Sequence, residues 1–306
     1  MTSTPAGSPS SEVVLAPRQS SNSVSVVIPV YNGERHLGET LRAVLNQTVR
    51  PAEVIVVDDG STDSTAQVAR SFGGAVTLVR TPNQGACKVR NLGASHACSE
   101  WIALCDHDDL WLPTKLEKQL RLAQQAPEVQ CVITDYAAYL DGQIAVRSHL
   151  SYAPEGFWQP ERLESGWVIR HSVTGKLTLF QPAITSTQMV RRSFYQRVGG
   201  FDPLAQAWAD DTCFHVRCLS VAPFGVVPEV LMHYRRRPGS LSADELRQLE
   251  NTVLVWEYML KHYPQVQPFR VELRAGLELM RVEVRESRRY RRRQKLKKLL
   301  PAFWRS

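Results

Sequence analysis

Apolar and polar residues alternate in blocks along the first half of the chain, and the blocks have the lengths of strands and helices. A β-branched run at 24–30 (VSVVIPV) predicts a strand buried on both faces, and the run at 53–57 has the same character. This alternation favours an α/β fold, in which helices cover both faces of a parallel, doubly wound sheet. Strands are predicted at 24–30, 53–57, 76–79, 101–105 and 129–139, and helices at 35–46, 86–97 and 116–123.

The alternation breaks after about residue 141. Asp141-Gly142 predicts a hairpin turn, and residues 150–175 are expected to be irregular. The remaining elements are predicted as strands at 184–190 and 224–231 and as helices at 192–198, 209–220, 244–262 and 266–300.

The composition is that of an ordinary globular protein, and a cytoplasmic location is expected. The chain has 306 residues, of which 43% are hydrophobic. It has no run of roughly 18 apolar residues of the kind that spans a membrane. Residues 1–23 are rich in Ser, Pro and Thr, which predicts a disordered leader rather than a secretory signal. The six cysteines include no C-x-x-C pair, which indicates reduced, mostly buried thiols.

The basic character of the chain is concentrated at its C-terminal end. The formal net charge is +7, yet residues 281–306 alone hold eleven Lys or Arg against two Glu. Read as a helix, residues 285–305 suit an anionic membrane surface and a peripheral location on the inner face of the membrane. A solvated, partly disordered end explains the segment equally well. No recognised nucleic-acid module accompanies the charge, so no nucleic-acid partner is expected.

Three predicted strands end in polar clusters: Tyr31-Asn32, Asp58-Asp59 and the DHDD run at 106–109. Ligands of doubly wound sheets bind beyond the carboxyl ends of the strands, so all three clusters are expected at one edge. Asp106 and Asp108, around one turn, suit a hard cation such as Mg²⁺ or Mn²⁺, with a diphosphate supplying further oxygens. The alternative is a loop whose acids cap a neighbouring helix.

Two further polar residues each allow two interpretations. Asp59 either accepts hydrogen bonds from a nucleobase or ribose, or belongs to a strand-to-helix turn in which Asp63 caps the next helix. Arg90 follows the Gly-containing loop Asn83-Gln84-Gly85. It either faces a phosphate or pairs with a neighbouring carboxylate, such as one of the acidic turn at 58–59. On the same helix, Gly93 is expected to allow a close approach to the sheet.

Taken together, the motifs resemble those of family 2 of the inverting glycosyltransferases. The runs VSVVIPVYN, LNQT, EVIVVDDGSTD, NQG followed by RN-x-G, and CDHDD-x-W match the family's order and spacing over about residues 24–125. A second stretch extends the resemblance to about residue 242, with GGFD at 199–202, Asp210-Asp211, and Tyr234-Arg235 through Ser242. Five ordered motifs in one chain are a far stronger signal than any one of them.

The resemblance implies a GT-A fold, a Rossmann-like doubly wound mixed sheet with C-terminal helices. It predicts one glycosyltransferase domain at 24–242, composed of a nucleotide-binding half at 24–125 and an acceptor half at 126–242. Residues 243–306 are then expected to form C-terminal helices with the basic tail.

The family's donor site maps onto several positions of the chain. Pro29 and Tyr31 match residues that line the nucleotide base, and Asn32 is assigned to the donor site beside them. Asp59 matches the acid that reads the uracil edge in uridine-using members. Asp106 and Asp108 match the metal and ribose motif, and Asp108 is expected to contact Mg²⁺ or Mn²⁺ directly.

On the acceptor side, Asp211 matches the family's general base. It would take the proton from the acceptor hydroxyl as that oxygen attacks the anomeric carbon opposite the departing diphosphate, which inverts the configuration. Asp211 also suits the stabilisation of the helix N-terminus that follows, and both roles are compatible. Asp210 is paired with it as a catalytic candidate, although the family usually has Glu at that position.

The basic run after the last predicted strand also departs from the family pattern. Arg237 stands where His is frequent, which removes a possible metal or phosphate ligand. Arg90, Arg235 and Arg237 are candidates to bind the donor diphosphate. A solvated basic loop is the alternative.

The sequence therefore predicts a metal-dependent, inverting glycosyltransferase with a nucleotide diphosphate-sugar donor, UDP-linked by preference. A saccharide or lipid-linked acceptor is expected, in surface polysaccharide or glycolipid synthesis. Two alternatives remain. One is a catalytically silent nucleotide-sugar-binding or scaffold protein of the same fold. The other is a nucleotidyltransferase, which would require a Gly-rich basic loop directly after the first strand. This chain reads PVYNGERHLGE there and lacks such a loop.

Overall fold

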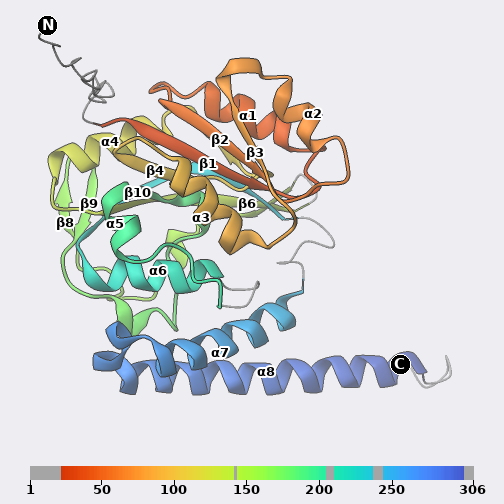
Figure 1. Cartoon of the computed structure of the whole chain (residues 1–306). Coiled ribbons are helices and arrows are strands. Elements are labelled where there is room, and N and C mark those ends of the chain that lie inside the picture. Colours follow the sequence, from red (N-terminus) through yellow and green to blue (C-terminus); the bar gives the residue numbers. More distant parts are fainter. Residues whose placement is uncertain (1–21, 141–142, 205–209, 237–243, 300–306) are drawn as a thin grey trace, which may run out of the picture.

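The computed structural model describes residues 22–140, 143–204, 210–236 and 244–299, with side chains described for all of these except 210, 245 and 292–299. The described strands form one sheet in the order β3-β2-β1-β4-β10-β6-β11-β9-β8, with β5 paired to β11 and β7 paired to β6. Figure 1 shows helices on both faces of this sheet and a hairpin of two long helices, α7 and α8, below it. The predicted leader lies outside the described residues, apart from Asn22 and Ser23.

The first half of the sheet is parallel, as the sequence predicts. Its strands are β1 (Val24–Val30), β2 (Glu53–Asp58), β3 (Thr77–Arg80) and β4 (Trp101–Leu104). Helices α1 (Leu37–Leu45) and α3 (Ala86–His96) cover opposite faces of β1, and α2 (Thr65–Arg70) follows β2. Val26 and Ile28 pack on the α1 side and Val27 packs on the α3 side. All seven residues of β1 are buried, because a strand covered on both faces has no polar side.

The second half makes the sheet mixed. Strand β10 (Met189–Arg191) lies antiparallel between β4 and β6 (Cys131–Leu140), and β11 (Phe224–Arg236) runs parallel to β6. The remaining strands are β5 (Leu110–Trp111), β7 (Gln143–Val146), β8 (Glu161–Leu163) and β9 (Gly166–Ile169). The predicted α/β class with a mixed, doubly wound sheet is therefore confirmed.

Three predictions in this half are wrong in detail. The segment 150–175 is not irregular throughout, because β8 and β9 form a hairpin that pairs with β11. The strand predicted at 184–190 is a 3-10 turn, η4 (Thr185–Thr187), followed by the three-residue strand β10. The strand predicted at 224–231 extends to Arg236, because β6 pairs along most of it through two register shifts. The predicted turn at 141–142 lies outside the described residues, although β6 and β7 on either side of it pair antiparallel.

The later helices agree with the sequence prediction apart from one boundary. They are α4 (Lys115–Gln125), α5 (Arg192–Arg197), α6 (Asp210–Val221), α7 (Glu245–His262) and α8 (Arg270–Leu299). Residues 264–269 form a 3-10 turn (η5) that contains two prolines, so α8 begins later than predicted. Short 3-10 turns also occur at Gly73–Ala75 (η1), Leu150–Tyr152 (η2) and Thr174–Lys176 (η3). Within the described part of the chain, no helix has both the length and the apolar character needed to cross a membrane.

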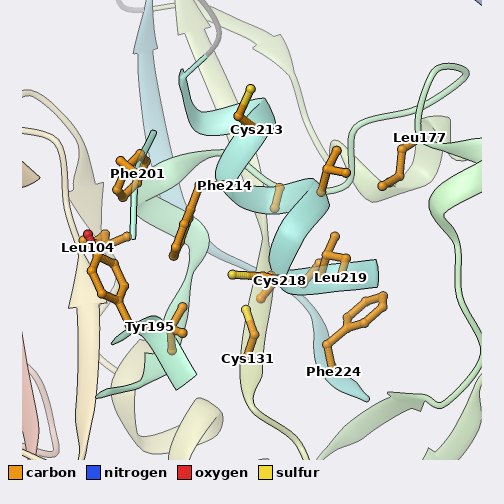
Figure 2. Packing of buried hydrophobic residues seen from close by; sticks show 14 of the residues in the cluster. Leu104, Cys131, Leu177, Tyr195, Phe201, Cys213, Phe214, Cys218, Leu219 and Phe224 are labelled. Atoms are coloured by element: carbon orange, nitrogen blue, oxygen red, sulfur yellow. The ribbon is translucent and has the colours of Figure 1, made fainter. Parts of the chain in front are cut away.

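One part of the core lies between the sheet and α6 and is shown in Figure 2. The rings of Phe201 and Phe214 stack with centroids 4.4 Å apart, and Tyr195 packs 5.2 Å from Phe214. Cys131 and Cys213 belong to the same cluster, and burial raises the pKa of each thiol to about 12. All six cysteines are unbridged and five are buried, which confirms the expectation of reduced, mostly buried thiols.

Gly93 allows α3 to lie directly against the sheet. A Cβ at this position would stand 2.3 Å from Val27 Cγ1 and 3.0 Å from Val57 Cγ2. Gly93→Ala is therefore expected to lower the free energy of unfolding by about 1–3 kcal/mol, the usual cost of overpacking. Urea unfolding measures the change. Gly74→Ala is the matched control, because a Cβ there meets no atom within 4 Å, and equal losses in both variants would contradict the prediction.

Candidate active site

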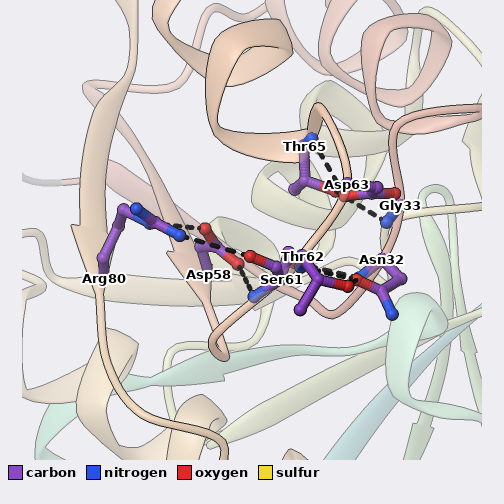
Figure 3. Close-up of polar contacts among 8 residues, drawn as sticks. All are labelled: Asn32, Gly33, Asp58, Ser61, Thr62, Asp63, Thr65 and Arg80. Carbon is purple, nitrogen blue, oxygen red and sulfur yellow. Dashed lines mark hydrogen bonds and ion pairs between the residues drawn. The ribbon is translucent and has the colours of Figure 1, made fainter.

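The ends of β1 and β2 are tied together by hydrogen bonds between the turns that follow them (Figure 3). Asn32 has a positive φ of 49°. Its backbone N–H donates to Ser61 Oγ (2.9 Å), and its side-chain oxygen accepts from the N–H of Thr62 (2.9 Å). The buried carboxylate of Asp58 accepts from the N–H of Ser61 (2.9 Å) and from Arg80 Nε (2.8 Å). Asp58 and Asn32 thus fix the backbone of this edge, and a contact between Asn32 and the donor stays a prediction.

Asp59 holds the loop that leads into α3. Its buried carboxylate accepts hydrogen bonds from the backbone N–H groups of Gln84 (2.8 Å) and Gly85 (2.9 Å). Gly85 has a φ of 91°, a conformation that costs glycine little. Each carboxylate oxygen has a further lone pair, so the predicted contact with a nucleobase is compatible with these two bonds.

The two residues predicted to line the base differ in accessibility. Pro29 is buried inside β1 in register with Val57 of β2. Tyr31 follows the end of the strand and is 49% exposed. Tyr31 therefore offers a ring to a ligand, whereas Pro29 shapes the strand from within.

The acidic turn after β4 is held from two distant parts of the chain. Arg90 of α3 donates from Nη2 to Asp106 Oδ1 (2.9 Å), and Ser186 of η4 accepts from the N–H of Asp106 (2.9 Å). Arg90 is 7% exposed and lies with Cζ 5.0 Å from the ring centroid of Phe201. Arg90 thus pairs with a neighbouring carboxylate, one of its two predicted interpretations. That carboxylate is Asp106, whereas Arg80 and backbone N–H groups bind the acids at 58–59.

Asp109 is the buried member of the acidic turn. It is 1% exposed, and its Oδ1 accepts from the backbone N–H of Arg235 (3.3 Å). Burial, and then the negative charges of Asp108 and Asp106, raise the pKa of Asp109 well above its usual range. Asp109 is therefore the least accessible acid of the turn, whereas Asp106 and Asp108 are partly exposed. Among the described residues, no group of three or more His, Cys, Asp or Glu is placed to hold a metal ion.

Arg235 joins the end of β11 to α1. Its Nη2 donates to Glu39 (2.8 Å), and its Nη1 lies 3.0 Å from His36 Nδ1. Together with its backbone bond to Asp109, these contacts place the end of β11 beside the acidic turn. Binding of a diphosphate by Arg235 stays a prediction, and Arg237 lies outside the described residues.

Asp211 lies in the first turn of α6, where its Oδ1 accepts from the N–H of Thr212 (2.7 Å). Burial raises the pKa of Tyr136, and Tyr234, Asp211, Asp135 and Asp109 raise it further. Asp211 and Asp109 of the acidic turn therefore both act electrostatically on one tyrosine of β6. The side chain of Asp210 lies outside the described ones.

Comparison with known proteins identifies the family. Residues 25–192 match the model for "Glycosyl transferase family 2". The chain belongs to this family. The resemblance noted from the sequence motifs is thus confirmed.

Relatives of this family 2 glycosyltransferase occur in several bacteria. An uncharacterized glycosyltransferase of Rickettsia typhi is 29% identical over 241 residues, which cover 78% of this chain and 71% of the relative. The glycosyltransferase GlyG of Streptococcus pneumoniae is 26% identical over 228 residues, covering 72% of this chain and 73% of GlyG.

The fold is also similar to solved structures of TarS from S. aureus. TarS 1-349 in complex with UDP-GlcNAc superposes with a TM-score of 0.61 at 19% identity, covering 83% of this chain and 71% of that one. The chain spans 40% of a longer TarS structure, with a TM-score of 0.57. The GT-A type of α/β fold is thereby confirmed.

Sequence reasoning missed two residues that organise the site of this family 2 glycosyltransferase. Ser186 binds the acidic turn and the strand that follows it. Its hydroxyl accepts from the N–H of Asp106, and its carbonyl accepts from Trp111 Nε1 (3.1 Å). Tyr136 stacks on His149 with centroids 4.5 Å apart, and the negative charges of Asp211 and Asp109 contribute to raising its pKa. Neither stands in a recognisable motif. The only sequence signal for Tyr136 was its position late in a buried strand.

Among the aromatic residues of 150–175, Trp158 and Trp167 are partly buried and pack against the core. The connection from β7 to β10 includes β8 and β9, which form one edge of the sheet (Figure 1).

Proposed function

We propose that this chain is an inverting glycosyltransferase that moves a sugar from a UDP-linked donor to an acceptor hydroxyl. The observation that carries the proposal is the acidic turn, where Arg90 from one half of the sheet and Ser186 from the other hold Asp106. TarS, which has a similar fold, has been crystallised with UDP-GlcNAc and with UDP. These complexes support a uridine nucleotide as the donor for this chain as well.

Mg²⁺ or Mn²⁺ is the proposed cofactor. Asp106 and Asp108 offer carboxylate oxygens, the ligands that such hard cations prefer. Mg²⁺ commonly binds through one or two carboxylates together with substrate phosphates and water. The two acids therefore fit the ion, although the described residues hold no larger group of ligands. A bound ion would neutralise charge on the leaving diphosphate.

Asp211 is the proposed general base. In the reaction, the proton of the acceptor hydroxyl passes to the Asp211 carboxylate while the acceptor oxygen bonds to the anomeric carbon. The bond between that carbon and the diphosphate oxygen breaks at the same time. Because attack comes from the face opposite the leaving group, the anomeric configuration inverts.

The proposed acceptor is a saccharide or a lipid-linked saccharide, in surface polysaccharide or glycolipid synthesis. The proposed location is the inner face of the membrane. The long basic helix α8 supports both, because a cationic helix is attracted to anionic lipid headgroups.

A thermal-shift screen with UDP, UDP-GlcNAc and other nucleotides, each with and without Mn²⁺, tests the donor. At 100 times Kd, a ligand that binds only the folded state stabilises it by about 2.7 kcal/mol. We expect such a shift for uridine nucleotides with Mn²⁺, accompanied by slow hydrolysis of the matching UDP-sugar. No shift with any nucleotide would overturn the proposal. A shift without hydrolysis or transfer would instead favour the catalytically silent alternative.

A further inference from the structure

The outer face of α8 carries exposed apolar residues. Val271, Leu279 and Val282 are 72%, 63% and 41% exposed. Their spacing of eight and three residues places them on one side of a helix with 3.6 residues per turn. Leu273 and Leu277 point the other way and are buried against the body of the protein. The helix therefore has two apolar faces. One packs against the body of the protein, and the other faces outward.

Charge is divided along the same helix. Residues 270–284 hold three arginines and three glutamates, whereas 285–299 hold nine lysines and arginines and one glutamate. Arg288 pairs with Glu250 of α7 (2.6 Å), and Arg291 pairs with Asp244 (2.7 Å), which caps the N-terminus of α7. Arg285 and Arg289 are exposed. The outward face thus begins with an apolar stripe and continues into a strongly cationic segment.

The cationic segment lies on the side of the molecule that carries the candidate active site. Arg291 contacts Asp244, the N-cap of α7. Only eight positions earlier in the chain, β11 ends at Arg236, next to the residue whose N–H binds Asp109. Figure 1 likewise shows the carboxyl end of β1 and the C-terminal end of α8 on the same side of the molecule.

We propose that the outer face of α8 binds an anionic lipid surface, with the Val271–Val282 stripe at the level of the headgroups and the arginines beyond it on the lipid phosphates. An amphipathic helix that carries Lys and Arg side chains binds such surfaces in two ways: its apolar side chains are buried in the lipid, and its cations are attracted to anionic headgroups. A second copy of the chain is disfavoured as the occupant, because its cationic segment would repel this one. A nucleic acid would use the arginines but would leave the apolar stripe exposed.

This surface would bring the enzyme to acceptors that are carried in the membrane. The inference deepens the proposed membrane location and rests on it, whereas none of the described side chains of α8 takes part in the candidate active site. Its failure and the failure of the proposed sugar transfer are therefore separate results.

Co-sedimentation of the full chain with lipid vesicles tests the inference. Vesicles of phosphatidylcholine mixed with phosphatidylglycerol are expected to bind the protein, with affinity falling as salt increases, and pure phosphatidylcholine is expected to bind it weakly. The double variant Arg285→Gln/Arg289→Gln should bind the anionic vesicles roughly thirtyfold more weakly, since each cation near the surface contributes about 1 kcal/mol. Leu279→Asp/Val282→Asp should also lose binding, and its exposed positions leave the fold intact.

Matched controls change the same side chains elsewhere. Arg50→Gln/Arg70→Gln removes two exposed cations from the nucleotide half, and Ile144→Asp/Val221→Asp adds two acids at exposed apolar positions. Both controls are expected to bind vesicles like the unmodified chain. Equal losses in controls and α8 variants, or no binding to anionic vesicles at all, would overturn the inference. The inference would also be overturned if the protein bound random-sequence duplex DNA more tightly than anionic vesicles and if the Leu279→Asp/Val282→Asp variant kept that DNA binding in full.

Discussion

Asp211→Asn is expected to reduce sugar transfer by about 10²–10⁴-fold, the contribution that a positioned general base typically makes. Asparagine has the shape of aspartate and can still accept from the N–H of Thr212, but it cannot take a proton from the acceptor. Donor binding is expected to remain unchanged, because the donor motifs lie at the ends of β1, β2 and β4. Release of UDP, followed with saturating UDP-sugar and acceptor, measures the rate, and thermal shift with UDP and Mn²⁺ measures binding.

The matched control is Glu161→Gln, which makes the same chemical change at an exposed acid paired with Arg170 on the far edge of the sheet. Surface pairs of this kind contribute little to stability, so this variant should transfer sugar normally. If Asp211→Asn transferred sugar at the full rate, Asp211 would not be the general base. Loss of donor binding in the same variant would show that it acts through the structure of the site instead.

Asp108→Asn is expected to abolish the part of the UDP-dependent thermal shift that requires Mn²⁺. A neutral amide is a poor ligand for a hard cation beside a diphosphate, and a bound Lewis-acid ion contributes several kcal/mol to reactions of this type. The rate of transfer should therefore fall by at least about 100-fold. Thermal shifts over a series of Mn²⁺ concentrations, with and without UDP, give the metal-dependent part directly.

Asp109→Asn provides the contrast within the same turn. The raised pKa of Asp109 means that its carboxyl group favours the neutral form, so an amide changes the charge of the turn far less than it does at Asp108. We expect Asp109→Asn to retain the Mn²⁺-dependent shift. A shift that survives in Asp108→Asn and disappears in Asp109→Asn would reverse the assignment of the metal ligand.

The parts of the fold that could be predicted from sequence are those in which local pattern and burial coincide. β1 and β2 are buried on both faces and therefore appear as unbroken apolar runs. Their polar ends carry the family's donor motifs within a few residues of each strand. The partners of these motifs could be anticipated less well. Arg90 was expected either to face a phosphate or to pair with a neighbouring carboxylate, and only the folded chain brings it to Asp106.

The parts that could not be predicted depend on contacts between distant residues. Ser186 reaches Asp106 across 80 positions of the chain. β10 is only three residues long, too short to leave a pattern, and it is defined by the two strands that it separates. Tyr136 has an ordinary strand sequence around it, and the charges of Asp211 and Asp109 that raise its pKa come from other elements of the chain.

The position of β10 limits how this enzyme can be redesigned. The predicted nucleotide and acceptor halves share one sheet, and the strand that lies between β4 and β6 comes from the middle of the acceptor half. A fragment that ends at residue 125 would leave β4 with an unpaired edge, which invites aggregation. Chimeras that aim to alter acceptor choice should therefore keep the chain through β10 intact and exchange loops at the strand ends.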